Sequence, residues 1–424
     1  MGKLYDVSGN IVSLDMPEPY INDIPIVGIY VDGNPPTTKE DGAVPATMFY
    51  KSKTKSFTNY ITMAIQGSSS QWYPKKNYTV KLFKDSGLTK KDKHEFRDWK
   101  SANKFVLKAN WIDHSHARNI VNARLWNQIV RSRSDFDSLP KQLRNARLAV
   151  DGFPVKVYLN GVYQGLYTWN LPKSVLYGLD DTIPENTLLE CDTAHTESSL
   201  SGLFRADNDD AGNWGDETHD EKPASITTAW NGVLAFVNSS TDANFTANFQ
   251  NYFDKQSVID EQIFIHLACI VDNLGKNQFY FTYDATKWYG GMYDMDGTWG
   301  CPPFPPSRST WYEYNTVFQS GYTICNNGGQ TNKLHERVTN LFASDIRTRY
   351  EALRATVLSE DNILAEFDKF MSVIPPYLYA EDYAETTAGG AYTNIPLKDT
   401  NNILQIREFV NARCAYVDGM VLND

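Results

Sequence analysis

Val271-Asp272-Asn273-Leu274-Gly275-Lys276-Asn277 is the stretch that says most about the fold of this chain. A helical pattern over 257–270 runs into it, and two alternating strands within 278–293 follow it. The second strand leads into Tyr293-Asp294-Met295-Asp296-Gly297. A hairpin brings its two ends together, so we expect the aspartates after it to lie close to Asp272 and Asn277.

Three carboxylates and an amide gathered at one strand edge would repel strongly without a cation, which predicts a metal site. Asp272 and Asn277 also have the spacing of the catalytic base and a magnesium ligand in the H-R-D-L-x-x-x-N segment of protein kinases, where a later D-F-G aspartate holds metal too. Here no His-Arg precedes Asp272, and no Phe follows Asp294 or Asp296. The alternative is that Asp272 merely ends a helix and Asn277 opens a strand.

The size and charge of the chain restrict the classes of function. A chain of 424 residues can form two lobes. The net charge of −11 argues against general binding of nucleic acid, yet residues 51–118 carry +10, which leaves −21 on the remainder. Such a division suits a basic wall that grips phosphates and an acidic wall that grips magnesium. Aromatic residues make up 13%, which is typical of a β-rich core or of sugar-stacking surfaces.

The sequence contains no clear motif for a membrane span, a zinc site or a calcium loop. The apolar run 263–271 is too short to span a bilayer, and the N-terminus has no apolar leader segment, so the protein is either not exported by that route or has been processed. The five cysteines are not spaced as zinc ligands are. Either Cys301 and Cys325 form a disulfide or the thiols are reduced. The acidic stretch 192–222 does not match a calcium loop, so we expect an exposed insertion.

Periodicity predicts an α+β protein whose strands dominate the first half. Strands are expected within 26–30, 62–66, 78–82 and 105–108, and a hairpin within 155–167 turns at Asn160-Gly161. One helix should start near Ser115, and further helices are predicted over 226–237, 257–270 and 332–356. We therefore expect a lead-in at 1–50, a β-rich part at 51–175 and a mainly helical part with the hairpin at 176–424.

The segment from Gln66 to Lys76 is a candidate phosphate-binding loop. Gly67 and Ser68 would offer backbone N–H groups, and Lys75 and Lys76 would offer cations. The loop has one glycine and matches no Walker motif, so a plain surface hairpin is equally consistent with it. Lys81 lies on the polar side of the next strand, where protein kinases have the lysine of V-A-I-K.

Four motifs in order resemble the spore coat protein H (CotH) kinase family. They are Pro74-Lys75-Lys76-Asn77-Tyr78, Asp113-His114-Ser115-His116-Ala117-Arg118-Asn119, Leu159-Asn160-Gly161-Val162-Tyr163-Gln164-Gly165-Leu166-Tyr167 and Tyr293-Asp294-Met295-Asp296-Gly297-Thr298-Trp299-Gly300. The resemblance extends from residue 66 to about 350. It departs from the family at Tyr293, where a Trp is usual, and after Tyr167, where a glutamate often follows.

The resemblance implies a two-lobed, highly diverged kinase-like fold and transfer of the ATP γ-phosphoryl group to serine of a partner protein. By position, Asp272 would be the base; Asn277 and Asp294 or Asp296 would hold Mg²⁺. Gly67, Ser68, Lys75, Lys76 and Lys81 would bind phosphates, and Arg118 would be an active-site or structural arginine. The partner would carry serine-rich basic segments, with neither nucleic acid nor membrane insertion involved, at a spore coat, virion or other surface.

A second class of function stays open at this stage. The missing glutamate leaves room for a pseudokinase, or for a non-catalytic surface, spore-coat or phage-tail protein that attaches to carbohydrate through its aromatic side chains.

Overall fold

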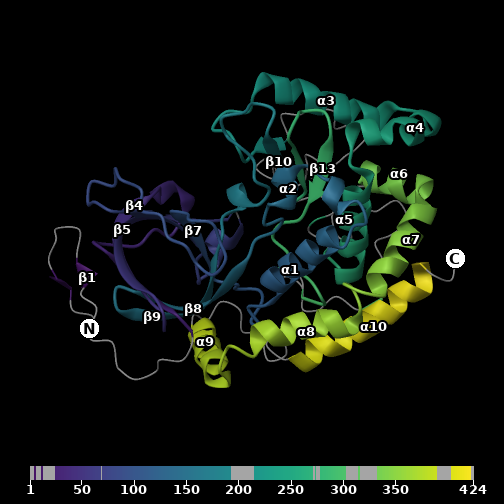
Figure 1. Ribbon diagram of the computed structural model, residues 1–424. Helices are drawn as coiled ribbons and strands as arrows, with labels where there is room; N and C mark the ends of the chain where they lie inside the picture. Colours follow the sequence, from purple (N-terminus) through teal and green to yellow (C-terminus); the bar gives the residue numbers. More distant parts are fainter. Residues whose placement is uncertain are drawn as a thin grey trace. The chain divides into compact units, whose positions relative to one another are not determined.

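The computed structural model describes residues 24–67, 69–191, 214–270, 273, 277–301, 314–315, 332–388 and 403–421, together with two short strands, β1 (Leu4–Tyr5) and β2 (Ile11–Val12). The protein is α+β, with a β-rich N-terminal part and a helical C-terminal part (Figure 1). It divides into two compact units. Unit 1 comprises Met1–Ala117, Asp151–Pro172 and Asp368–Asn401; unit 2 comprises Arg118–Val150, Lys173–Phe367 and Asn402–Asp424.

Unit 1 is built on a closed barrel of seven strands. In the order of their pairing the strands are β3 (Ile26–Val31), β4 (Val44–Lys51), β5 (Ser56–Ile65), β6 (Tyr78–Phe83), β7 (Lys104–Lys108), β9 (Val162–Asn170) and β8 (Gly152–Leu159). Neighbours are antiparallel except β3 and β8, which pair in parallel and close the barrel. Closure leaves no exposed edge on this sheet, and alternate residues of β5 and β6 point into its core.

Aromatic rings fill much of the barrel core. Phe105 stacks on Trp169 with ring centroids 4.9 Å apart, and Phe96 meets Phe105 edge-on at 5.1 Å. The predicted turn between β8 and β9 is confirmed, because Asn160 and Gly161 both have the positive φ angles, 49° and 82°, that a type I′ turn needs. The abundant aromatics of this unit therefore include a large share that builds the core.

A helix from the C-terminal part of the chain completes unit 1. Helix α9 (Pro376–Ala388) packs against β9. Two short 3-10 helices lie between barrel strands, η1 (Lys39–Asp41) between β3 and β4 and η2 (Ser69–Trp72) between β5 and β6. A further one, η4 (Lys173–Val175), follows β9 in the chain and belongs to unit 2.

Unit 2 holds a four-stranded antiparallel sheet and most of the helices. The strands, in spatial order, are β11 (Trp214–Asp216), β10 (Thr187–Cys191), β12 (Phe279–Thr282) and β13 (Trp288–Gly291). The helices are α1 (Arg118–Arg131), η3 (Phe136–Ser138), α2 (Lys141–Arg144), α3 (Ala224–Ser239), α4 (Asp242–Tyr252), α5 (Lys255–Ala268), α6 (Lys333–Leu341), α7 (Ala343–Arg354), α8 (Glu360–Met371) and α10 (Ile403–Val421). The chain passes from unit 2 to unit 1 within α8.

Helix α5 is the central helix of unit 2. It packs against α1, α7, α10 and β13, and every residue from Ser257 to Ile265 is buried. A helix that is buried on all sides must satisfy its polar groups internally. Asp260 does so by pairing with Arg349 at 2.6 Å, and Glu261 accepts a hydrogen bond from the Tyr280 hydroxyl at 3.1 Å. The buried α5 gives the segment that follows it a rigid starting point.

The structure differs from the sequence prediction in several places. The helix expected over 332–356 is two helices, α6 and α7, because Phe342 leaves the helical region with φ −125° and ψ 30°. Helices α2, α4, α8, α9 and α10 and strands β10 and β11 were not expected, and β11 lies in the stretch 192–222, where an exposed insertion was expected. The expected linear division also differs from the units: residues 26–51 belong to the barrel, α1 to unit 2 and α9 to unit 1. Pairing between segments far apart in the chain, which periodicity does not encode, sets these memberships.

Candidate active site

The end of α5 and the loop after β13 are joined through the backbone. Helix α5 stops at Cys269, which adopts the left-handed conformation with φ 57°. The carbonyl of Ala268, the last helical residue, accepts a hydrogen bond from the Trp299 N–H at 2.9 Å. The Asp294–Gly300 segment is thus held to the end of the helix that precedes the Asp272–Asn277 stretch in the sequence.

The side chain of Asn273 ties the two ends of the hairpin together. Its amide nitrogen donates to the Tyr293 carbonyl at 2.9 Å and to the Asn277 carbonyl at 3.4 Å. In the hairpin itself, Phe279 pairs with Gly291 and Thr282 with Trp288. The hairpin thus brings the backbone of Asn277 near that of Tyr293, the residue before Asp294; whether the side chains gather as expected stays a prediction. Asp272 lies outside the described residues.

Both predicted metal ligands that flank the hairpin have left-handed backbones. Asn277 has φ 57° and Asp294 has φ 53°, a region that few residues other than Gly, Asn and Asp adopt. Such conformations persist where the surroundings fix them, and they are common at functional sites. Here the fixing groups are identifiable, because Asn273 holds one side and α1 holds the other.

Side chains in the first turns of α1 form hydrogen bonds to the loop that contains Asp294 and Asp296. Asn119 Oδ1 accepts from the Met295 N–H at 3.2 Å, and Asn122 Nδ2 donates to the Met295 carbonyl at 2.9 Å and to Thr298 Oγ1 at 2.7 Å. Asn122 Oδ1 accepts from the Trp299 indole N–H at 2.7 Å. The second and fourth motifs of the sequence therefore meet in space, and each fixes the conformation of the other.

Arg118 also forms hydrogen bonds to this loop. Its Nε donates to the Thr298 carbonyl at 2.9 Å and its Nη2 to Gln405 Oε1, on α10, at 2.8 Å. The side chain is buried. Of the two roles expected for this arginine, the described contacts fit the structural one, in which it positions the aspartate loop.

Sequence reasoning missed Asn273, Asn119 and Asn122 as positioning residues. Asn122 follows Arg118 by four residues and Asn119 by three, spacings that make helix side chains neighbours, and this was the available signal. Asn273 gave no signal beyond its place between Asp272 and Asn277, because its partners come from the far end of a hairpin.

Negative charge surrounds this loop. Burial raises the pKa of Tyr293, and the nearby carboxylates of Asp294, Glu190, Glu217 and Asp296 raise it further. Tyr293 stacks on Phe279 with ring centroids 4.9 Å apart. A group of oxygen donors in an acidic setting is what a hard cation such as Mg²⁺ requires.

Lys173 partly offsets that charge. It forms an ion pair with Glu190, another with Glu217 at 2.8 Å, and its ammonium lies 5.4 Å from the centre of the Tyr293 ring. Burial raises the pKa of Glu190 to about 7, and Glu217 adds to the rise against the opposing effect of Lys173. Above that pH one cation lies between two carboxylates, which leaves an excess negative charge.

The donors expected for a divalent ion are the amide oxygen of Asn277 and the carboxylates of Asp294 and Asp296, and all three have the oxygen chemistry that Mg²⁺ prefers. Among the described residues no group of three His, Cys, Asp or Glu side chains is placed to hold a metal ion.

In unit 1 the structure gives Lys75 a role other than the expected one. Its ammonium is buried and lies 2.7 Å from Asp382 Oδ1, on α9, and it donates to the Leu166 carbonyl. Asp382 also accepts from the Leu166 N–H at 2.7 Å and lies 2.8 Å from His116 Nε2. We had expected Lys75 to bind phosphates; these contacts make it a structural residue that holds α9 to the barrel.

The other candidates of unit 1 lie around the loop between β5 and β6. Gly67 has φ 96°, and a Cβ there would lie 2.0 Å from Ser70 Oγ, so only glycine fits. Lys76 Nζ donates to the Gln71 carbonyl at 2.6 Å, and Lys81 is exposed on β6. The Gln66 N–H bonds to the Asn77 carbonyl at 2.9 Å and closes the loop at its base. Ser68 lies outside the described residues.

Comparison with known proteins agrees with the motif order. The family model described as CotH kinase protein matches residues 63–417, which is most of the chain. No curated protein matches the chain. Within the described residues, no helix is both long enough and apolar enough to cross a bilayer. The match spans both units, including α1, the hairpin and α10, and so covers every contact given above for unit 2. The chain belongs to the CotH kinase family.

Proposed function

We propose that this protein is an ATP- and Mg²⁺-dependent protein kinase that transfers the γ-phosphoryl group to serine of a partner protein. The observation that carries the proposal is that hydrogen bonds from two sides fix the loop 293–299, which contains Asp294 and Asp296 (the aspartate loop). Asn273 bonds to the Asn277 and Tyr293 carbonyls, and Asn119 and Asn122 bond to Met295 from the other side. Catalysis of phosphoryl transfer depends mostly on such positioning.

In the proposed reaction Asp272 accepts the proton of the seryl hydroxyl while the seryl oxygen forms a bond to the γ-phosphorus. The bond between that phosphorus and the bridging oxygen breaks, and ADP leaves. Mg²⁺, held by Asn277 with Asp294 or Asp296, would offset the charge of the phosphate oxygens. Arg118, Asn119 and Asn122 keep the aspartate loop in place throughout.

The acidic setting of the site supports a basic partner segment. Glu190 and Glu217 share one lysine, so they add to the negative field around Tyr293. A serine flanked by Lys or Arg would be attracted to that field. We therefore propose a serine-rich basic segment as acceptor, on a protein of a spore coat or of another assembled surface.

The proposal is tested by transfer of label from γ-labelled ATP to the protein itself and to serine-rich basic peptides. We expect Asp272→Ala to lower the transfer rate by about 10²-fold or more, which is the usual contribution of a general base. Asp361→Ala is the matched control, since Asp361 is an exposed aspartate on α8. The control should keep wild-type transfer, and chelation of Mg²⁺ should abolish it.

A thermal-shift measurement with MgATP separates loss of chemistry from loss of binding. Wild type and Asp272→Ala should both be stabilised by MgATP if the aspartate acts only as a base. Equal labelling of wild type and Asp272→Ala would refute the assignment of the base. Absence of both labelling and stabilisation in the wild type would refute the kinase proposal.

A further inference from the structure

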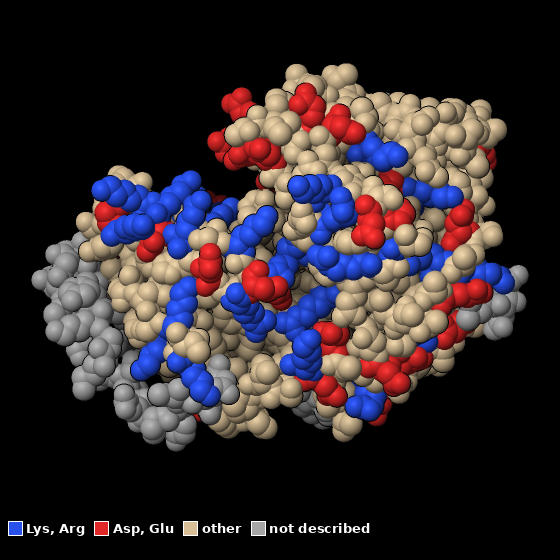
Figure 2. Space-filling model, viewed as in Figure 1, with Lys and Arg blue, Asp and Glu red and all other residues tan. Residues whose placement is uncertain are grey.

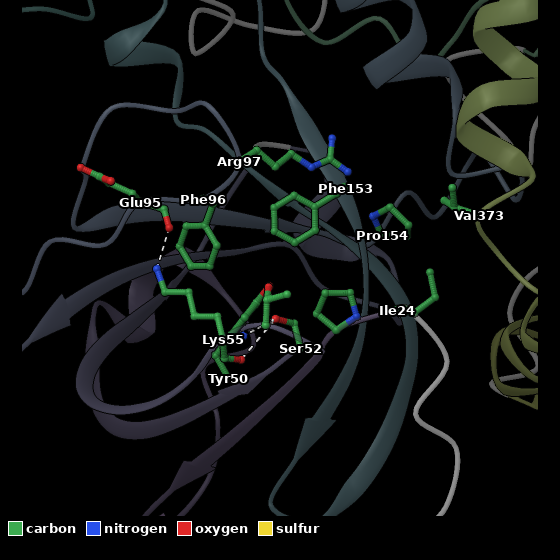
Figure 3. Close-up of a pocket in the computed structure, with 12 residues that line it drawn as sticks. Ile24, Tyr50, Ser52, Lys55, Glu95, Phe96, Arg97, Phe153, Pro154 and Val373 are labelled. Carbon is green, nitrogen blue, oxygen red and sulfur yellow. Dashed lines mark hydrogen bonds between the residues drawn. The ribbon is translucent and has the colours of Figure 1, made fainter.

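One end of the barrel in unit 1 contains a cavity of about 500 Å³ (Figure 3). Its walls come from the hairpin between β4 and β5, from residues 95–97, from the start of β8 and from residues 24–25. A volume of this size is typical of small-molecule sites, which combine an apolar lining with a few polar groups. None of the residues assigned above to phosphoryl transfer lines it.

Three aromatic rings contribute to the apolar lining, together with Ile24, Pro25, Pro154 and Val373. Tyr50 meets Phe96 edge-on with centroids 5.2 Å apart, and Phe96 lies 6.0 Å from Phe153. All three side chains are buried and belong to the barrel core. They therefore present a fixed aromatic surface to the cavity rather than one that collapses when empty.

Two cations line the same cavity, and each is held against an aromatic ring. The Lys55 ammonium lies 4.4 Å from the centre of the Phe96 ring and donates to the Glu95 carbonyl at 2.6 Å. The Arg97 guanidinium lies 4.8 Å from the centre of the Phe153 ring. A guanidinium stacked on a ring still directs its N–H groups outward in its own plane, where they match a carboxylate.

The backbone at Arg97 adds to this arrangement. Its φ of 52° places a non-glycine residue in the left-handed region, which is seldom adopted by arginine. The side chain directly before it, Phe96, is buried in the core, while Arg97 itself is exposed. This turn of the backbone puts the ring of one residue and the cation of the next along one wall (Figure 3).

The charges of the lining set the charge of the ligand. Glu95 is the one carboxylate among the lining residues, and its side chain points away from the three rings in Figure 3. Lys55 and Arg97 outnumber it by one positive charge. More basic side chains gather over β4, β5 and the loop that follows β6 (Figure 2), where Lys53, Lys91 and Lys93 are exposed. The cavity thus lies in a positive field with aromatic walls.

We propose that this cavity binds a small aromatic carboxylate. The ring of the ligand would lie against Tyr50, Phe96 and Phe153, and its carboxylate would accept hydrogen bonds from Arg97 and Lys55. A single negative charge matches the excess of one positive charge in the lining better than a dianion does. This site is separate from the proposed kinase active site, and the two proposals are tested independently.

Saturation-transfer NMR and calorimetry on the full chain test the proposal with four probes that share one ring: phenylacetate, phenylacetamide, phenethylammonium and phenyl phosphate. We expect phenylacetate to bind about tenfold more tightly than phenylacetamide, since a charged hydrogen bond contributes on this scale. Phenethylammonium should not bind. Absence of phenylacetate binding, equal affinity for the amide, or tighter binding of phenyl phosphate would each overturn the proposal.

Substitutions of residues that line the cavity test whether phenylacetate binds there. Arg97→Gln and Lys55→Met should each weaken phenylacetate about tenfold, because each removes a charged donor. Lys93→Gln is the matched control, as an exposed cation in the same loop that does not line the cavity. Circular dichroism checks that each variant folds. Phenylacetate affinity unchanged in both lining variants, or lowered equally in the control, would refute the assigned site.

Discussion

At the scale of single residues, three asparagines and one arginine decide the conformation of the aspartate loop. Asn122 alone makes three hydrogen bonds, to Met295, Thr298 and Trp299, and its side chain is wholly buried. An asparagine serves this role because its amide donates and accepts at once, which neither aspartate nor leucine does.

We expect Asn122→Ala to destabilise the protein by about 3 kcal/mol, because it leaves the Trp299 indole N–H and the Met295 carbonyl buried without this partner. Urea unfolding measures the change. Asn244→Ala, on the exposed side of α4, is the control and should change stability by less than about 0.5 kcal/mol. Equal stabilities of Asn122→Ala and wild type would contradict the proposed role of Asn122.

The buried Asp382 gives unit 1 an acid-sensitive contact. Burial by itself would raise the pKa of this carboxyl, but Lys75 and His116 outweigh burial and hold it well below its ordinary value. A group with a depressed folded pKa stabilises the protein above its unfolded pKa, about 4, and this contribution is lost as the pH falls below that value.

The wild type should therefore lose stability on acidification below about pH 4 more steeply than Asp382→Asn, by up to about 1.4 kcal/mol per pH unit. Chemical unfolding at a series of pH values measures both slopes. Asp361→Asn, at an exposed position, should keep the wild-type slope. Identical slopes for the wild type and Asp382→Asn would refute the assignment.

At the scale of elements, the sheet of unit 2 places its central strand β10 so that Glu190 lies opposite Phe279 of β12. Phe279 stacks on Tyr293, so the register of this pair brings the Glu190 carboxyl to the segment that bears the aspartates. A shift by one residue would turn Glu190 to the other face of the sheet.

Glu190 has a raised pKa of about 7, so the folded protein keeps its proton at pH values where the unfolded chain has released it. Stability should therefore fall as the pH rises from about 4.5 to 7, by up to about 1.4 kcal/mol per pH unit. Glu190→Gln should remove this part of the slope in urea unfolding, whereas Glu185→Gln, at an exposed position before β10, should not. A steeper slope in Glu190→Gln than in the wild type would contradict the prediction.

At the scale of the whole molecule, neither unit is one continuous segment. Unit 1 takes α9 from the C-terminal part of the chain, and unit 2 takes α10 from beyond it. In unit 2, Asp418 of α10 accepts from the Tyr350 hydroxyl at 2.7 Å and from Arg354 Nε at 2.9 Å. Arg413 donates to the His266 carbonyl near the end of α5 at 2.6 Å.

Removal of residues 403–424 should therefore increase amide hydrogen exchange in α7 and at the end of α5, because their contacts with α10 are lost. Exchange in β4 and β5 should change far less, since the barrel keeps α9. Removal of residues 422–424 alone is the control. Equal increases in α7 and in the barrel strands would show that the two units unfold as one.

The sequence by itself determined most of the barrel strands, the hairpin of β12 and β13, the helix α5, the type I′ turn and the family, because these depend on local periodicity, turn chemistry and the order of short motifs. It also indicated that Asn277 and the start of the Asp294 segment meet, since a hairpin is a local structure. Only the tertiary structure decided that Lys75 binds Asp382, that Asn119 and Asn122 hold the loop, and that seven strands close into a barrel. Those contacts join residues up to 307 positions apart, and no local pattern specifies which distant group a buried side chain will meet.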